Sequence, residues 1–257
     1  MNTVGKQAPP AAEGQAVNVA ALVRNLRRRF DDRAGVRTLA VARTGVQPAA
    51  PVRTRTILGG DVALEFGKPG VSSVVTTLVT HTDDVTDGRL TLAAPAEPLP
   101  PGTALPLGVL VLAGTPGIQT LDCYGLRNAA VRIDGLDGVS VRAMPGRLWV
   151  RVSRDAAARG VGPVAFAQAI YAACRRVNGV EAIEVFIACE DDLVRALEPY
   201  SAIASAQTGE HVRLKWNAFG DLECNSMDCR SCEEAPVCDQ LRQVMKIRGK
   251  RRKKAHV

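Results

Sequence analysis

With 257 residues, 46% of them hydrophobic, the chain is long enough to bury one large core or two small ones, which excludes wholesale disorder. The formal net charge of +7 equals the charge of residues 246–257, so the rest is neutral overall and a generally basic nucleic-acid-binding fold is not indicated. No apolar run reaches about eighteen residues and no signal-peptide pattern is present. We therefore expect a cytoplasmic protein without a membrane segment.

The N-terminal region consists of a low-complexity stretch and then a helix. Residues 1–16 are rich in Ala, Pro, Gly and Gln, a composition typical of disorder. A helix is expected to begin behind Asn18, because apolar residues recur at helical spacing from Val19 to Phe30. Its arginines are predicted to lie mostly on the opposite, solvent-exposed face of the helix; they are Arg24, Arg27, Arg28 and Arg29.

Strand and helix patterns alternate along residues 17–220. Apolar runs and alternating patterns predict strands at 38–42, 62–66, 71–80, 89–93, 107–113, 139–143, 147–152 and 183–188. Helical spacing predicts helices at 119–133, 163–177 and 191–205. Residues 97–102 contain three prolines and are expected to be a linker or crossing loop. The order favours an α/β domain with a mixed sheet covered by helices.

Four cysteines lie within fifteen residues and are predicted to bind a metal centre within the segment 221–240. Thiolates separated by such short segments can converge on one soft metal at little loop-closure cost. The seven cysteines of the chain are an odd number, which in a reducing compartment favours free or metal-bound thiols over disulfides. The predicted ligands are Cys224, Cys229, Cys232 and Cys238.

The spacing of this cluster leaves more than one occupant open. Its first part, Cys-x4-Cys-x2-Cys, matches the first three ligands of plant-type ferredoxins, although the fourth ligand of those proteins lies much further along the chain. We expect an iron–sulfur cluster, of the [4Fe-4S] type. Zinc is the alternative, although structural zinc sites more often show two Cys-x2-Cys pairs and only Cys229 and Cys232 form one here. Unmetallated or redox-paired thiols are the third possibility. The other cysteines, Cys123, Cys174 and Cys189, are expected to be buried apolar side chains.

Residues 241–257 are predicted to form a short helix and a basic tail. Such a tail is either a solvated end or a docking element for an acidic partner, with nucleic acid as a less favoured partner. The predicted partner-binding residues are Lys246, Arg248, Lys250, Arg251, Arg252, Lys253 and Lys254.

Five segments resemble, in the same order, a region of the acetyl-CoA synthase beta subunit of the carbon monoxide dehydrogenase/acetyl-CoA synthase complex. They fall within a stretch of similarity from about residue 18 to residue 230. The segments are residues 65–70 (EFGKPG), 84–92 (DVTDGRLTL), 105–114 (LPLGVLVLAG), 146–160 (GRLWVRVSRDAAARG) and 183–192 (IEVFIACEDD).

The resemblance extends to residues 225–229 (NSMDC), which are similar to a stretch just after the cluster ligands of that family. It implies an α/β domain ahead of an iron–sulfur centre and a place in one-carbon or corrinoid metabolism. An early Cys-x2-Cys pair and the Cys-Gly-Cys that holds nickel in the family do not occur in this sequence. Nickel is therefore not expected, and acetyl-CoA synthesis itself is not predicted.

Three functions follow as hypotheses. The first is an iron–sulfur protein that delivers electrons or docks a methyl-carrying corrinoid protein. The second is a zinc-stapled binding module whose basic tail docks an acidic protein or nucleic acid. The third is a divergent enzyme of acyl or methyl transfer, a CO-methylating acetyl-CoA synthase-like acyltransferase, that handles coenzyme A near Trp149 and neighbouring arginines such as Arg151. In a predicted strand, packing explains Trp149 and Arg151 equally well.

Overall fold

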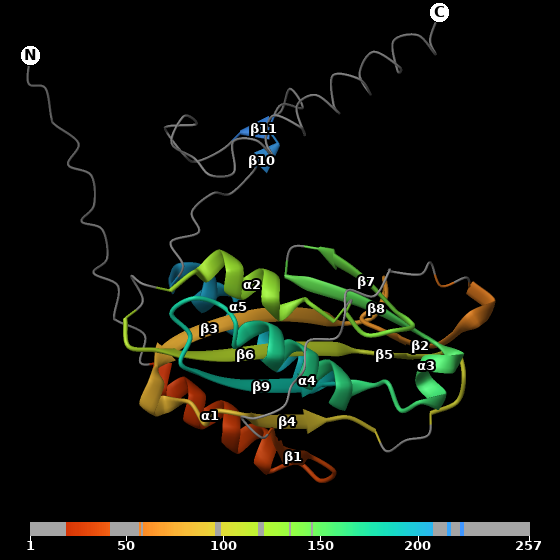
Figure 1. The fold of residues 1–257 in the computed structure, drawn as a ribbon, viewed down its shortest axis with the longest axis horizontal. Helices are drawn as coiled ribbons and strands as arrows, with labels where there is room; N and C mark the ends of the chain where they lie inside the picture. The colour runs from red at the N-terminus through yellow and green to blue at the C-terminus, as the bar shows by residue number, and fades with distance from the viewer. Residues whose placement is uncertain are drawn as a thin grey trace, which may run out of the picture. The chain divides into compact units, whose positions relative to one another are not determined.

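The computed structural model describes residues 19–41, 57, 59–95, 99–117, 121–133, 135–144, 146–207, 215–216 and 222–223. The chain divides into two compact units, Met1–Ala204 and Ser205–Val257. The first unit is an α/β fold with two mixed sheets (Figure 1). In the second unit, β10 (Lys215–Trp216) pairs antiparallel with β11 (Leu222–Glu223). The domain boundaries predicted at residues 16, 220 and 240 lie outside the described residues.

The larger sheet of the first unit has five strands of mixed direction. Pairing is parallel between β4 and β9 and between β6 and β3, and antiparallel at the other two junctions. In spatial order the strands are β1 (Arg37–Ala40), β4 (Arg89–Ala93), β9 (Ala182–Ala188), β6 (Leu107–Thr115) and β3 (Ser73–His81).

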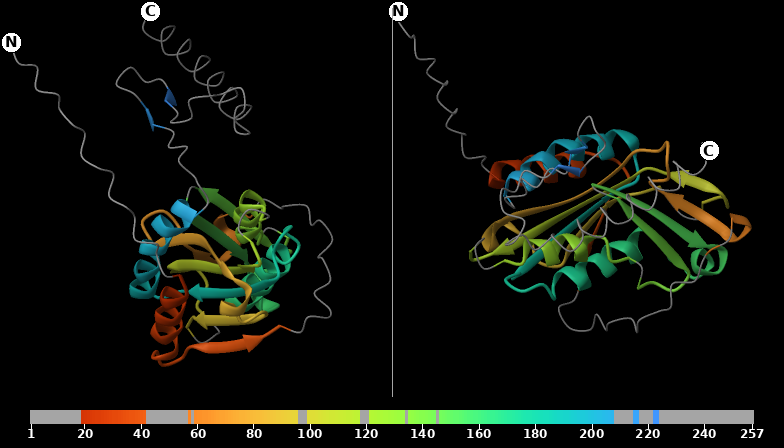
Figure 2. Two further views of the ribbon diagram at one scale, coloured as in Figure 1. Left: turned by 90° about the vertical axis from the view of Figure 1, so that its left-hand side faces the viewer. Right: turned by 90° about the horizontal axis from the view of Figure 1, so that it is seen from above.

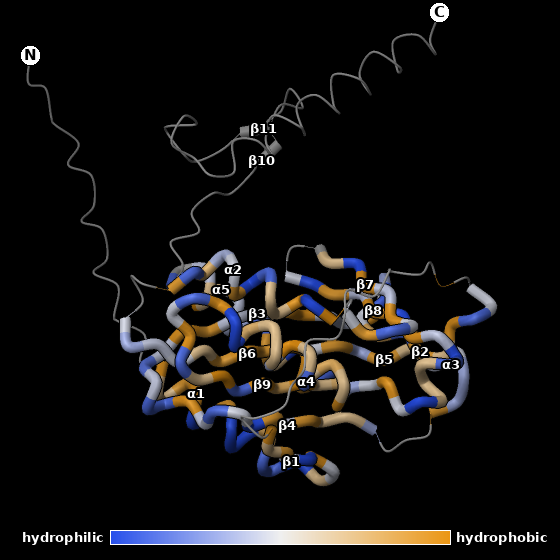
Figure 3. The backbone as a smooth tube through the Cα atoms, viewed as in Figure 1, coloured by the Kyte–Doolittle hydropathy of each residue, from blue (hydrophilic) through white to orange (hydrophobic). Residues whose placement is uncertain are grey.

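Helices cover both faces of this sheet, which explains why its central strands are apolar. Every residue of β6 and β9 is buried, and Figure 3 shows both strands coloured largely hydrophobic. The view from above in Figure 2 separates the helix pairs: α1 and α5 lie over one face, α2 and α4 over the other. Their bounds are α1 Val19–Asp31, α2 Cys123–Ala130, α4 Pro163–Cys174 and α5 Asp191–Gln207.

A second sheet of four strands continues from the first. Its strands, in spatial order, are β5 (Thr103–Leu105), β2 (Val62–Phe66), β8 (Arg147–Ser153) and β7 (Val139–Met144). Only Pro106 separates β5 from β6, so these two consecutive strands belong to different sheets and connect them. The sheets are also tied together by Ser73, whose hydroxyl donates to the carbonyl of Leu148 at 2.8 Å and accepts from its amide at 3.0 Å. The short elements are α3 (Arg154–Ala158) and the 3₁₀ turns Gly59–Asp61 and Thr82–Asp84.

The predicted α/β class, with mixed pairing and covering helices, is confirmed, although the strands form two larger sheets where one was expected. A single sheet was expected from the order of the elements. A second sheet forms because β5, the short strand after the proline-rich stretch, pairs with the distant strand β2. Among the described helices, none has the length and apolar character that crossing a bilayer requires. Of the predicted metal-binding segment 221–240, only Leu222 and Glu223 lie within the described residues.

Candidate functional site

The predicted metal ligands and the basic tail fall on residues that the structure does not describe. Cys224 directly follows β11 in the chain, and Cys229, Cys232 and Cys238 come after it. In the described part of the chain, no three His, Cys, Asp or Glu side chains gather as metal ligands. The tail residues that also fall outside the described part are Lys246, Arg248, Lys250, Arg251, Arg252, Lys253 and Lys254.

The three remaining cysteines are free thiols in the first unit. Cys174 of α4 and Cys189, just after β9, are buried, as expected from the sequence, and Cys123 of α2 is half-buried. Burial raises the pKa of Cys174 to about 12, and burial with a contribution from Glu190 raises that of Cys189 to about 12. Burial also raises the pKa of the Cys123 thiol. A protonated, enclosed thiol is a poor metal ligand and a poor nucleophile, so Cys174 and Cys189 are structural.

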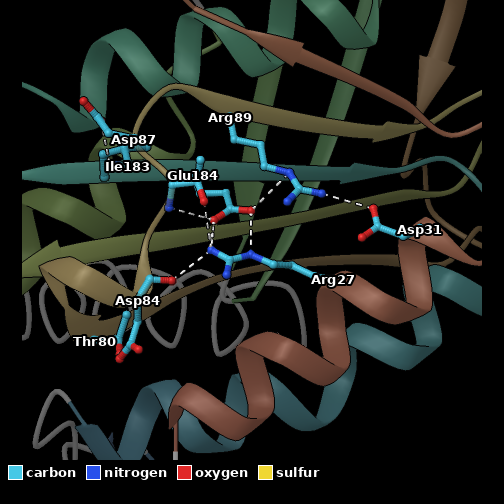
Figure 4. A network of polar contacts seen from close by, with 9 residues as sticks. Arg27, Asp31, Thr80, Asp84, Asp87, Arg89, Ile183 and Glu184 are labelled. Atoms are coloured by element: carbon cyan, nitrogen blue, oxygen red, sulfur yellow. Dashed lines mark hydrogen bonds and ion pairs between the residues drawn. The ribbon is translucent and has the colours of Figure 1, made fainter.

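A buried carboxylate forms the centre of a polar network that joins α1 to the larger sheet (Figure 4). The side chain of Glu184, in the middle of β9, is fully buried. It accepts hydrogen bonds from Arg27 of α1, with Nε at 3.1 Å, and from the amide of Thr86 at 3.2 Å. Arg89 of β4 adds an ion pair at 3.6 Å and reaches Asp31 of α1 at 3.1 Å. The network fixes α1 on the sheet.

Most of the four arginines of α1 were expected to face solvent, and Arg27 is the exception. Its side chain is 22% exposed, and its hydrogen bond to Glu184 raises the pKa of the guanidinium. Position 27 lies one turn from Val23 and Phe30, which are both buried, so the helix carries this arginine at the margin of its apolar face. Arg24, Arg28 and Arg29 are exposed, as expected.

Asp87 ties the start of β9 to α4. One of its carboxylate oxygens accepts from the amide of Ile183 at 3.0 Å and from the hydroxyl of Tyr171 at 3.5 Å. The Nε of Arg175 lies 3.7 Å from the same oxygen. Both buried carboxylates, Asp87 and Glu184, have their charge compensated by arginines and amides, which is the arrangement of structural rather than catalytic groups.

A tryptophan between two arginines lies on the second sheet. Arg142 of β7 is the cross-strand partner of Trp149 of β8, and its guanidinium carbon is 5.1 Å from the ring centroid. The guanidinium carbon of Arg151, two positions further along β8, is 5.6 Å from the same centroid. Arg151 also forms an ion pair with Glu65 of β2 at 3.3 Å. Both cations lie within cation–π distance of the indole.

Two details make this group, Arg142, Trp149 and Arg151, the arrangement among the described residues best suited to an anionic ligand. The indole Nε1 is buried, and no described residue accepts a hydrogen bond from it. Arg142 is exposed, and no described carboxylate pairs with it. A guanidinium beside an aromatic ring can bind a phosphate while the ring contacts a flat group.

Comparison with known proteins does not assign the chain to a family. No protein-family model matches it, and a search of curated proteins finds no significant match. The resemblance to the acetyl-CoA synthase beta subunit stays a prediction from the residues quoted above.

Proposed function

We propose that the chain is an iron–sulfur protein in which Cys224, Cys229, Cys232 and Cys238 hold a [4Fe-4S] cluster. In this proposal it serves one-carbon or corrinoid metabolism as an electron-transfer component or a docking component for a methyl carrier. The observation that carries the proposal is the placing of four of the seven cysteines within fifteen residues. Four thiolates supply the complete ligand set of such a cluster.

The other cysteines support this assignment by elimination. Cys174 and Cys189 have a pKa of about 12 and are enclosed in the core, so neither can supply a thiolate at neutral pH without unfolding. Cys123 is half-buried and its pKa is also raised. The part of the proposal that concerns one-carbon metabolism rests on the resemblance alone.

Anaerobic purification tests the cluster, with iron, acid-labile sulfide and zinc measured on the same sample. The proposal predicts a brown protein with about four iron and four sulfide per chain, as a [4Fe-4S] centre requires. Cys229→Ser should lose most of the iron, whereas the matched variant Cys123→Ser should keep it. Colourless protein that holds one zinc per chain after anaerobic reconstitution would contradict the cluster and favour the zinc-stapled module.

The group of Arg142, Trp149 and Arg151 favours a second candidate, a divergent acyl- or methyl-transfer enzyme that binds coenzyme A. The guanidinium of Arg142 would neutralise phosphate charge, since that of Arg151 is already paired with Glu65, and the indole would contact the adenine. The chain has two tryptophans, Trp149 and Trp216, so the titration is best done in a Trp216→Phe background. Coenzyme A should then quench the Trp149 emission, and Arg142→Ala should weaken the effect more than Arg154→Ala. Unchanged fluorescence and no heat of binding would remove this candidate.

A further inference from the structure

Residues 1–245 have a net charge of zero, but the positive and negative charges are concentrated in different parts of this sequence. Residues 1–60 contain ten basic and three acidic residues, a net charge of +7. The whole chain is also +7 and residues 246–257 contribute +7, so residues 61–245 must carry −7. The N-terminal quarter of the chain is therefore a distinct basic element. Nine of its ten basic residues are arginines, the residue suited to bidentate contact with carboxylates and phosphates.

In the described part of the chain, this charge is displayed by the outer face of α1, defined by Arg24, Arg28 and Arg29. All three side chains are exposed, and no described carboxylate forms an ion pair with them. The neighbouring arginines differ: Arg27 pairs with Glu184, and Arg33 pairs with Asp192. The outer face of α1 is thus a local excess of positive charge and not half of an internal salt-bridge network.

The fold holds this helix in one orientation. The opposite side of α1 buries Val23, Leu26 and Phe30, and Phe30 packs edge-to-face on Phe186 of β9 with ring centroids 5.2 Å apart. The pairs Arg27–Glu184 and Arg89–Asp31 fix the rotation of the helix about its axis (Figure 4). Arginines on a fixed helix lose less freedom on binding a partner than arginines on a mobile tail do.

We propose that the outer face of α1 is a docking surface for an acidic protein. Guanidinium groups at positions 24 and 28 are one helical turn apart and can each bind a carboxylate with two parallel hydrogen bonds. Such contacts steer association and set the orientation of the partner. The inference is independent of what the cysteine segment binds.

Two observations favour a protein over a nucleic acid. The only aromatic residue in the first 60 is Phe30, which is buried, so this surface offers no platform on which bases could stack. A long polyanion would also extend beyond α1 and meet the rest of the first unit, whose described residues from 61 to 204 carry a net charge of −2, with fourteen acidic and twelve basic side chains, whereas a compact acidic surface of matching size would not.

The test compares two charge-reversal variants of the full chain, R24E/R28E on α1 and R154E/R176E on exposed positions elsewhere in the first unit. Both change the net charge equally and leave the basic tail in place. Poly-L-glutamate serves as the acidic polypeptide and a short DNA duplex as the polyphosphate, with binding measured against salt. R24E/R28E should lose about tenfold or more in affinity for poly-L-glutamate, and R154E/R176E less than about twofold. R24K/R28K should lose an intermediate amount, because lysine keeps the charge but cannot form the two parallel hydrogen bonds.

Equal losses in both charge-reversal variants, or none in either, would overturn the proposal, because a specific surface would then be absent. A loss by R24E/R28E for the DNA duplex that matches or exceeds its loss for poly-L-glutamate would also overturn it, in favour of a nucleic-acid surface. Circular dichroism and thermal unfolding establish that the variants remain folded, and R24Q/R28Q replaces R24E/R28E if the charge reversal perturbs the helix.

Discussion

Glu184 and Arg27 are 157 positions apart in the chain, yet two nitrogens of the Arg27 guanidinium, Nε and Nη2, donate hydrogen bonds to the carboxylate of Glu184. The Nε distance is 3.1 Å. Glu184 is fully buried and Arg27 is 22% exposed, so the pair is largely removed from water. This contact joins α1, the first element of the fold, to β9, a late one, and it sets the direction in which the outer arginines of α1 point.

Removing one partner of this pair should destabilise the fold strongly. Glu184→Ala leaves the guanidiniums of Arg27 and Arg89 without their carboxylate, and breaking a buried pair in this way costs about 3–5 kcal/mol. The free energy of unfolding in urea, measured for Glu184→Ala, Arg27→Ala and the double variant, gives the coupling energy, which should be about 1–3 kcal/mol.

Arg28→Ala is the matched control, because Arg28 is exposed on the same helix. It should change the free energy of unfolding by no more than about 0.5 kcal/mol. Additive effects of Glu184→Ala and Arg27→Ala would show that the two side chains do not act as a pair.

The turn after β2 should not tolerate a side chain at Gly67. Its φ is +62°, and a Cβ there would lie 2.2 Å from the carbonyl oxygen of Leu148. Gly70 has a φ of +87° and no atom within 4 Å of a Cβ, so Gly70→Ala isolates the backbone strain, about 1–2 kcal/mol. Gly67→Ala adds a backbone clash and should lower the free energy of unfolding by at least about 2 kcal/mol more. An equal loss of unfolding free energy in the two variants would mean that the backbone at Leu148 moves away from the added Cβ at little energetic cost.

Stability should fall at alkaline pH through the buried thiols. Cys174 and Cys189 have a pKa of about 12 in the folded protein, above the value of about 8.5 expected in an unfolded chain. Between these values the unfolded chain loses thiol protons that the folded protein keeps. The stabilising contribution is therefore complete below about pH 8.5 and is lost as the pH rises towards 12.

Urea unfolding at pH 8 and pH 10 measures this effect. Cys174→Ala removes one of the two thiols and should show a smaller decrease between the two pH values than the wild type, while Cys123→Ala should alter the decrease less. Rapid alkylation of Cys174 in the native protein at pH 8 would contradict the buried, protonated state.

The helices and strands whose own residues show a clear hydrophobic or capping pattern were predicted well from the sequence. The continuous apolar run of β6 and the five residues of β4 identify strands from local residues alone, and Pro163 and Asp191 mark helix starts. The elements that it missed depend on distant partners or are short. β5 has three residues and is a strand because β2 lies beside it, and α3 has five residues capped by Ser153, whose Oγ accepts from the amide of Ala156 at 3.2 Å.

The polar network was missed for a related reason. A single glutamate within the apolar strand Ala182–Ala188 is a usable signal, because a buried carboxylate requires a cationic partner. The sequence does not say which of the chain's many arginines that partner is. The pairing follows from the layer order, which places α1 over the face of β9 that bears Glu184.

The central claim is that the four clustered cysteines hold an iron–sulfur cluster, and metal and sulfide analysis of the protein purified without oxygen tests it most directly. The account predicts about four iron and four sulfide per chain, together with a broad visible absorption that bleaches on reduction, as expected of a [4Fe-4S] centre. Protein that is colourless, lacks sulfide and retains one zinc per chain even after anaerobic reconstitution with iron and sulfide would contradict it.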